Sequence, residues 1–183
     1  MTSRVLGLFV AVGVYALGGV ISLQPPAASV THGKPLSLDV NVSGVADLYA
    51  FQFDVRFDPA ILSAVSVSEG NLFSGVGVFF SPGAINNTSG TITFIADSLA
   101  GPGSGISANG SLAKILFNTI GEGTSKVNLT NVVLLDSGLG DIIVEVADST
   151  ATVTPEPSVG GLLGTVLLAA VGARRFRTSS RQR

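Results

Sequence analysis

The chain contains no cysteine and no tryptophan, and it has one histidine, His32, among its 183 residues. The absence of cysteine excludes a disulfide scaffold, a thiolate zinc site and a cysteine nucleophile. A single histidine excludes a multi-histidine metal site, and it argues against a Ser-His-Asp triad. The composition therefore predicts a protein that is not an enzyme.

Charged residues are scarce as well, at 12% of the chain against about a quarter in typical soluble domains. Most of the basic charge lies near the two ends, so that residues 30–154 hold 4 basic and 11 acidic residues. This middle segment is therefore near −7, although the whole chain is at −2. Because phosphate neutralisation requires clustered Lys and Arg, nucleic acid is not expected as a partner.

The first 29 residues have the pattern of an export signal. Arg4 precedes an apolar stretch from Val5 to Leu23, and small, turn-prone residues follow. A leader peptidase requires small side chains three residues and one residue before the bond that it cuts. Toward the end of this stretch and beyond it, Ala27 with Ser29 meets this rule, as does Val20 with Ser22 less well. We therefore expect a signal peptide over residues 1–29, cut between residues 22 and 29. The alternative is an uncleaved anchor, because 19 apolar residues can span a bilayer.

The C-terminal segment, residues 154–183, has three parts. Pro155-Glu156-Pro157 comes first, an uncharged apolar run over Val159–Ala173 follows, and arginines end the chain. A helix of that run is about 22 Å long, short of the roughly 30 Å hydrocarbon core, but flanking arginines can reach the interface. We therefore expect a transmembrane helix over 159–173, with the Arg-rich end at 174–183 in the cytoplasm and the preceding domain outside.

This tripartite order resembles the PEP-CTERM protein-sorting signal of Gram-negative bacteria. The resemblance implies recognition by an exosortase, an integral-membrane peptidase or transpeptidase, in organisms that build extracellular polysaccharide. The processing motif is then Pro155, Glu156 and Pro157, and the cytoplasmic anchor is Arg174, Arg175 and Arg177. The protein is expected at the cell envelope, the outer surface or in the extracellular matrix, after transient anchoring in the inner membrane. An ordinary short tail anchor is the alternative.

Residues 30–153 show short runs that alternate apolar and polar residues. Tyr49–Phe57 places its aromatic and aliphatic side chains on one face, and Asp58-Pro59 ends the run because proline cannot donate to a ladder. Eight to ten strands are expected, from these runs: Leu36–Val42, Tyr49–Phe57, Leu62–Val67, Gly75–Phe80, Thr91–Ala96, Leu112–Asn118, Lys126–Leu129, Val132–Leu135, Ile142–Val146 and Thr150–Val153. We predict an all-β fold, a single antiparallel two-sheet sandwich of the jelly-roll or immunoglobulin-like kind, between an N-terminal signal helix and a C-terminal transmembrane helix.

The order of these features resembles a cohesin domain. Cohesins open with a Gly-rich entry into an alternating strand, matched by Gly33–Val40, and continue with an aromatic strand ending in an Asp-Pro turn, matched by Leu48–Leu62. A later Gly-small-Leu-Ala-x-Ile-x-Phe strand is matched by Gly110–Phe117, and an Asp-x-Gly hairpin by Asp136–Gly138. The resemblance implies a nine-stranded jelly roll over residues 30–153 that binds dockerins, the calcium-dependent helical modules of polysaccharide-degrading enzymes. It names no partner-face residue, and another sandwich with similar turns is the alternative.

Two groups of charged residues are candidate sites. Asp136–Asp141 could supply oxygen ligands to Ca²⁺, but it lacks the EF-hand pattern, and a solvated hairpin turn is the preferred interpretation. Asp54 and Arg56 are expected on the exposed face as a surface ion pair, not as part of a catalytic carboxylate pair. No catalytic, cofactor or metal site is therefore predicted.

Three functions remain open. The first is a binding or adhesion module that displays a sheet face to a dockerin-like or other surface protein. The second is a carbohydrate-binding module in extracellular polysaccharide attachment or catabolism, which requires exposed aromatic rings. Tyr49 is expected on a buried face, and Phe79-Phe80 exposes one ring unless its strand is buried on both sides, which we favour. The third, a glycosidase accessory or weak enzyme, requires a carboxylate pair across a cleft.

Overall fold

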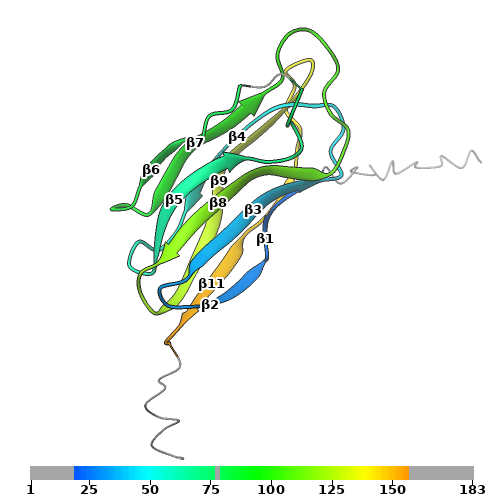
Figure 1. The fold of residues 1–183 in the computed structure, drawn as a ribbon. Helices are drawn as coiled ribbons and strands as arrows, with labels where there is room; N and C mark the ends of the chain where they lie inside the picture. Colours follow the sequence, from blue (N-terminus) through cyan, green and yellow to red (C-terminus); the bar gives the residue numbers. More distant parts are fainter. Residues whose placement is uncertain (1–18, 77–78, 157–183) are drawn as a thin grey trace, which may run out of the picture.

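The computed structural model describes residues 19–76 and 79–156, which form a sandwich of two β-sheets (Figure 1). The strands are β1 (Val20–Gln24), β2 (Ala27–Thr31), β3 (Pro35–Ser43), β4 (Leu48–Arg56), β5 (Leu62–Glu69), β6 (Ala84–Asn86), β7 (Thr91–Ser98), β8 (Gly110–Thr119), β9 (Gly123–Asp136), β10 (Glu145–Ala147) and β11 (Ser149–Thr154). No helix in the described residues is long and apolar enough to cross a membrane. The expected span over 159–173 lies outside them, as does most of the expected leader.

One sheet has five strands in the order β10-β1-β3-β8-β5, and the other has six in the order β2-β11-β9-β4-β7-β6. The predicted two-sheet sandwich is confirmed, but the pairing is not wholly antiparallel, since β1 runs parallel to β10 and β2 runs parallel to β11. The first strand breaks at Pro25 and Pro26, where the chain passes from one sheet to the other. Proline interrupts a ladder because it has no N–H to donate. β10 and β11 also lie in different sheets, so the first two strands of the domain pair with its last two, one pair in each sheet.

A single apolar core fills the space between the sheets, and aromatic rings occupy its centre. The Phe51 and Phe53 rings stack with their centroids 5.7 Å apart, and Phe57 meets Phe117 edge-on at 5.2 Å. Offset stacking and edge-to-face contact are the favourable arrangements for aromatic rings. The buried face predicted for Tyr49–Phe57 is thus confirmed for its three phenylalanines, which are at most 6% exposed.

Tyr49 does not belong to this core. The register between β4 and β9 shifts between Leu48 and Ala50, and Leu48 is buried in place of Tyr49. Tyr49 is half-buried, and its hydroxyl donates a hydrogen bond to the carbonyl oxygen of Gly101. The predicted burial of Tyr49 is therefore wrong, because a bulge breaks the period-two alternation at the start of the strand.

The sandwich starts about ten residues earlier than the sequence predicts. β1 and most of β2 lie within residues 1–29, and Ile21 and Leu23 are completely buried in the core. The expected domain boundary at residue 30 falls inside β2. A leader and a buried strand are both apolar, so hydrophobicity alone does not separate them in the stretch Val5–Leu23.

Four expected strands also differ. Gly75–Phe80 contains no strand among its described residues, and the short β6 follows it instead. Lys126–Leu129 and Val132–Leu135 are one strand, β9, which bends at Asn131 with φ of 52°. The interval Ile142–Val146 is irregular except where it enters β10. In β9 the bend at Asn131 disturbs the alternation on which the prediction of two strands depends.

Candidate functional site

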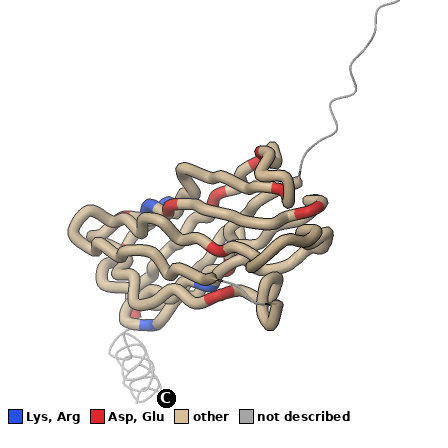
Figure 2. Tube along the Cα trace, turned by 90° about the horizontal axis from the view of Figure 1, so that it is seen from above, with Lys and Arg blue, Asp and Glu red and all other residues tan. Residues whose placement is uncertain are grey.

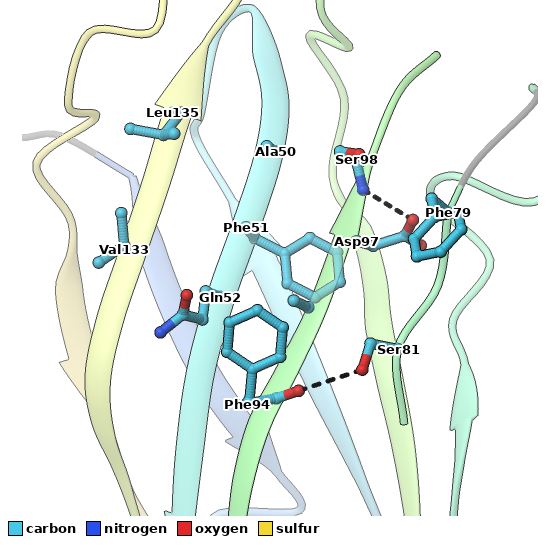
Figure 3. Close-up of a pocket in the computed structure, with 11 residues that line it drawn as sticks. Ala50, Phe51, Gln52, Phe79, Ser81, Phe94, Asp97, Ser98, Val133 and Leu135 are labelled. Carbon is cyan, nitrogen blue, oxygen red and sulfur yellow. Dashed lines mark hydrogen bonds between the residues drawn. The ribbon is translucent and has the colours of Figure 1, made fainter. Parts of the chain in front are cut away.

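A groove of about 390 Å³ lies on the outer face of the six-stranded sheet. Small side chains on β4 and β7, Ala50 and Ala96, form its floor. Figure 3 shows Val133 and Leu135 of β9 on one side of Ala50 and Phe79 on the other. The chain thus leaves a mostly apolar hollow on a face that a solvated sheet normally covers with polar groups.

The strand register explains why these residues share one face. Ala50 of β4 lies opposite Leu135 of β9 and Ser98 of β7, and Gln52 lies opposite Val133 and Ala96. Directly opposed residues of neighbouring strands project to the same side of a sheet. The groove is therefore built from consecutive outward positions across three strands, and the rigid ladder fixes their spacing.

Large apolar side chains at the groove are exposed. Phe79 is 81% exposed, Phe94 is 56% exposed and Val133 is 41% exposed. Phe80 instead packs against the core, so two-sided burial of Phe79-Phe80 is wrong and one ring faces solvent. Scattered exposed apolar residues need no explanation, but apolar residues gathered on one patch mark an interaction site.

Asp54 holds the backbone that presents Phe94. Phe94 and Asn131 both have positive φ, at 60° and 52°, on the two strands that flank β4. One carboxylate oxygen of Asp54 accepts a hydrogen bond from the Phe94 N–H at 2.7 Å, and the other accepts one from the Asn131 side-chain amide at 2.6 Å. Asp54 thereby stabilises a bend in each neighbouring strand, since positive φ is unfavourable for residues with a side chain.

The expected ion pair between Asp54 and Arg56 is wrong. The one ion pair recorded in the described part of the chain joins Lys114 to Asp39 at 3.6 Å, on the other sheet. Both side chains of that pair are well solvated, so it contributes little to stability. Asp54 instead accepts hydrogen bonds from Phe94 and Asn131 on the neighbouring strands, and spacing along its own strand does not reveal these partners.

Asp97 is a buried carboxyl group at the groove, on β7 beneath Phe79 (Figure 3). It is 3% exposed, and one of its oxygens accepts the Ser98 N–H at 2.8 Å while the other has no partner. Burial raises the pKa of Asp97 to about 6, and the negative charge of Glu69 acts in the same direction. Loss of hydration makes the Asp97 carboxylate costly to ionise, and the hydrogen bond from Ser98 offsets only part of that cost.

In the hairpin that was considered for calcium, the Asp136 carboxylate binds backbone N–H groups, in agreement with the preferred interpretation as a solvated turn. Asp136 accepts the N–H groups of Gly138 and Gly140, both at 2.8 Å, which fits a solvated turn. Next to it, Ser137 donates its hydroxyl to Asp47 at 2.6 Å, and this hydrogen bond is the main reason that the pKa of Asp47 lies below its usual value. No group of three or more His, Asp or Glu residues within the described ranges is arranged to hold a metal ion.

The predicted sorting residues are described only in part. Pro155 and Glu156 follow β11 directly and are exposed, whereas Pro157 and the arginines Arg174, Arg175 and Arg177 lie outside the described residues.

Figure 2 shows acidic residues spread over the sandwich, with few basic ones among them. The apolar groove therefore lies on a domain whose net charge is negative.

Comparison with known proteins identifies the domain. The family model described as "Cohesin domain" matches residues 21–154, and no curated protein matches the sequence. The fold is similar to that of the sixth cohesin of Acetivibrio cellulolyticus scaffoldin B, solved in complex with a mutant Cel5 dockerin. That comparison has a TM-score of 0.61 and 19% identity, and it covers 75% of this chain and 99% of that chain.

Two other solved structures show the same fold. The Coh-OlpC-Doc435 complex of Clostridium thermocellum, a type I cohesin–dockerin complex, gives a TM-score of 0.63 at 10% identity, covering 76% of this chain and 96% of that one. A non-cellulosomal cohesin of the archaeon Archaeoglobus fulgidus gives 0.59 at 16% identity, covering 75% and 91%. With most of the chain matched by the family model, this protein belongs to the cohesin family.

Proposed function

We propose that this chain is an exported, non-catalytic binding module that captures a dockerin or dockerin-like protein on the outer face of β9, β4 and β7. The groove on that face carries the proposal, because it gathers Phe79, Phe94 and Val133 in exposed positions over a floor of alanines. Structures of cohesins from Acetivibrio cellulolyticus and Clostridium thermocellum in complex with dockerins support this class of partner.

The chemistry of the groove indicates how a partner is held. Full burial of a large apolar side chain contributes about 1.5–3 kcal/mol, so the exposed rings and Val133 supply the main driving force when a partner covers them. A few such residues usually dominate an interface. The negative charge of the domain favours a partner with basic residues around its apolar contact, and such charges act mainly on the association rate.

Export and sorting complete the proposal. The expected leader and the Pro155-Glu156-Pro157 tail support delivery to the envelope, with processing by an exosortase. β11 ends at Thr154, and the exposed Pro155 and Glu156 follow it without an intervening linker. A motif placed outside the sheet remains open to a membrane peptidase while the domain is folded.

Carbohydrate binding has narrower support. Phe79 and Phe94 are exposed aromatic rings, the feature that this alternative requires. They border an apolar groove with a valine and a leucine, however, and Tyr49 turns its hydroxyl to the backbone of Gly101. We therefore treat retention on polysaccharide as the outcome that would replace the protein-binding proposal.

Two matched substitutions test the proposed face. Val133→Glu places a charge in the groove, whereas Val65→Glu makes the same change on β5 of the other sheet, where the side chain is 48% exposed. The exported protein is titrated with dockerin-bearing proteins of its own host, with calcium and with EDTA. We expect Val133→Glu to weaken binding by more than about tenfold and Val65→Glu to leave it unchanged.

Equal losses of affinity in Val133→Glu and Val65→Glu would contradict a contact at the groove and indicate that the partner binds another surface. Binding of polysaccharide alone, with no dockerin-bearing protein retained in calcium, would overturn the proposal. Because dockerins depend on calcium, we also expect EDTA to abolish the capture that calcium permits.

A further inference from the structure

β1 is an integral strand of the five-stranded sheet and not part of a removable segment. It lies between β3 and β10, with five residue pairs to β3 that run from Val20 opposite Ser43 to Gln24 opposite Asp39. Ile21 and Leu23 have no exposed surface. Removal of this strand would leave β3 without a neighbour on that side and would open the core.

The fold extends one residue further, to Gly19. The carbonyl oxygen of Gly19 accepts the N–H of Glu145 at 2.9 Å, which continues the ladder between β1 and β10. A Cβ atom at this position would run into the carbonyl oxygen of Ser43 and the side chain of Val45. Glycine is thus required where the chain enters the sheet, and a mature protein with this fold needs residue 19 onward.

A bond that meets the leader-peptidase rule lies immediately before this residue. Ala16-Leu17-Gly18 places small side chains three residues and one residue before the Gly18–Gly19 bond. The pairs Val20 with Ser22 and Ala27 with Ser29 also place small side chains correctly, but cleavage after them would cut β1 or remove it completely. The fold therefore selects among sequence matches that are otherwise of similar quality.

We propose that a leader peptidase cuts this chain between Gly18 and Gly19, so that β1 is retained as the first strand of the mature protein. This inference rests on the export that forms part of the proposed function. The step is a hydrolysis: water adds across the amide, leaving a carboxylate on Gly18 and a free α-amino group on Gly19. The leader then ends where the sheet begins, and the apolar stretch Val5–Leu23 serves two purposes in succession.

The test uses the full-length gene expressed in a Gram-negative host, with the exported protein purified and its N-terminus determined by sequencing and intact mass. We expect the mature chain to begin at Gly19. Gly18→Phe places a large ring next to the cut and is expected to leave at least about tenfold more precursor, whose mass retains the leader. Ser29→Phe makes the same change at an exposed position of β2 and is expected to give a normal mature N-terminus.

The outcomes separate this inference from export itself. A mature chain that begins at Ile21, at Leu23 or at Val30 would overturn the inference and leave export intact. A protein that keeps Met1 and stays in the cytoplasm would overturn both. Normal processing of Gly18→Phe together with failure of Ser29→Phe would also overturn it, since that result assigns the cut to the downstream pair.

Discussion

At the scale of single residues, Asp97 makes an unusual prediction about pH. Its pKa is about 6 in the folded protein against 3.8 for an ordinary aspartate, so the folded state holds the proton more tightly than the unfolded chain does. Stability should therefore rise as the pH falls from 7 through 6 toward 4, and it should fall as the pH rises. The difference corresponds to about 2–3 kcal/mol at most.

Asp97→Asn removes this ionisation. We expect the variant to be more stable than the parent at pH 7 and to show a flatter dependence on pH between 4 and 7 in urea unfolding. Asp141→Asn, an exposed change in the hairpin, serves as the control and should keep the parent's pH dependence. A pH slope that survives Asp97→Asn would show that Asp97 is not the group responsible.

A second residue-scale prediction concerns Asp54. Asp54→Ala deletes the acceptors of the Phe94 N–H and the Asn131 amide, and it should cost about 1–3 kcal/mol in urea unfolding. Because Phe94 borders the groove, capture of the proposed dockerin partner should weaken as well. Arg56→Ala is the matched control, since the structure gives Arg56 no part in this contact, and it should change the unfolding free energy by less than about 0.5 kcal/mol. Equal losses of unfolding free energy in Asp54→Ala and Arg56→Ala would indicate that the two side chains form an ion pair after all, and would contradict this role of Asp54.

At the scale of strands, alternation predicted the central elements and failed where the chain bends. The strand over Tyr49–Phe57 was recognisable because its inward positions are aromatic or aliphatic. The bulge at its start, however, turns the Tyr49 side chain out of the core. β1 was hidden, since a core strand joined to a leader has no change in hydrophobicity at the boundary. Such a boundary is set by pairing with distant strands, here β3 and β10, and the sequence of β1 alone does not contain that information.

The groove was predictable in one respect only. Ala96 and Val133 are apolar at outward positions next to the buried apolar residues Ile95 and Leu134, which departs from the pattern of a half-solvated sheet. That departure is a sequence signal for an interaction face. The positions of Phe79 and Phe94 depend instead on a loop and on a residue with positive φ, and neither follows from periodicity.

An element-scale prediction follows from the free edge of β5. The side-chain oxygen of Asn87 accepts the Ala64 N–H at 2.7 Å, and its amide donates to the Ala64 carbonyl at 3.0 Å. One side chain thus occupies two groups that would otherwise be open to pairing with another chain. Asn87→Ala should lower the unfolding free energy by about 1–2 kcal/mol and promote association on heating, as measured by light scattering. Asn87→Asp keeps only the acceptor, so its unfolding free energy should lie between those of the parent and Asn87→Ala. Equal unfolding free energies and equal light scattering for the three proteins would contradict this role of Asn87.

At the scale of the whole described domain, the groove and the C-terminal end of β11 lie at opposite ends of the sandwich. Val153 of the last strand pairs with Gly123 at the start of β9, whereas Leu135 of the groove lies near the end of β9. Twelve residues of strand span about 40 Å, less the effect of the bend. In Figure 1 the described chain leaves the sheets beyond β11, away from the upper ends of β4 and β7. A module held at its C-terminal end would therefore present the groove away from the surface that anchors it.

The absence of cysteine makes this orientation testable, because one introduced thiol is the only one in the chain. Ser104→Cys places the thiol on an exposed loop after β7, and Glu122→Cys places it on the exposed turn before β9, near the tail. Each variant is coupled to a large polyethylene glycol maleimide and titrated with the proposed dockerin partner. Coupling at position 104 should weaken binding by more than about tenfold, because the polymer crowds the groove, whereas coupling at position 122 should have little effect. The opposite pattern would place the partner beside the tail, where a membrane anchor and a bound partner compete for the same space.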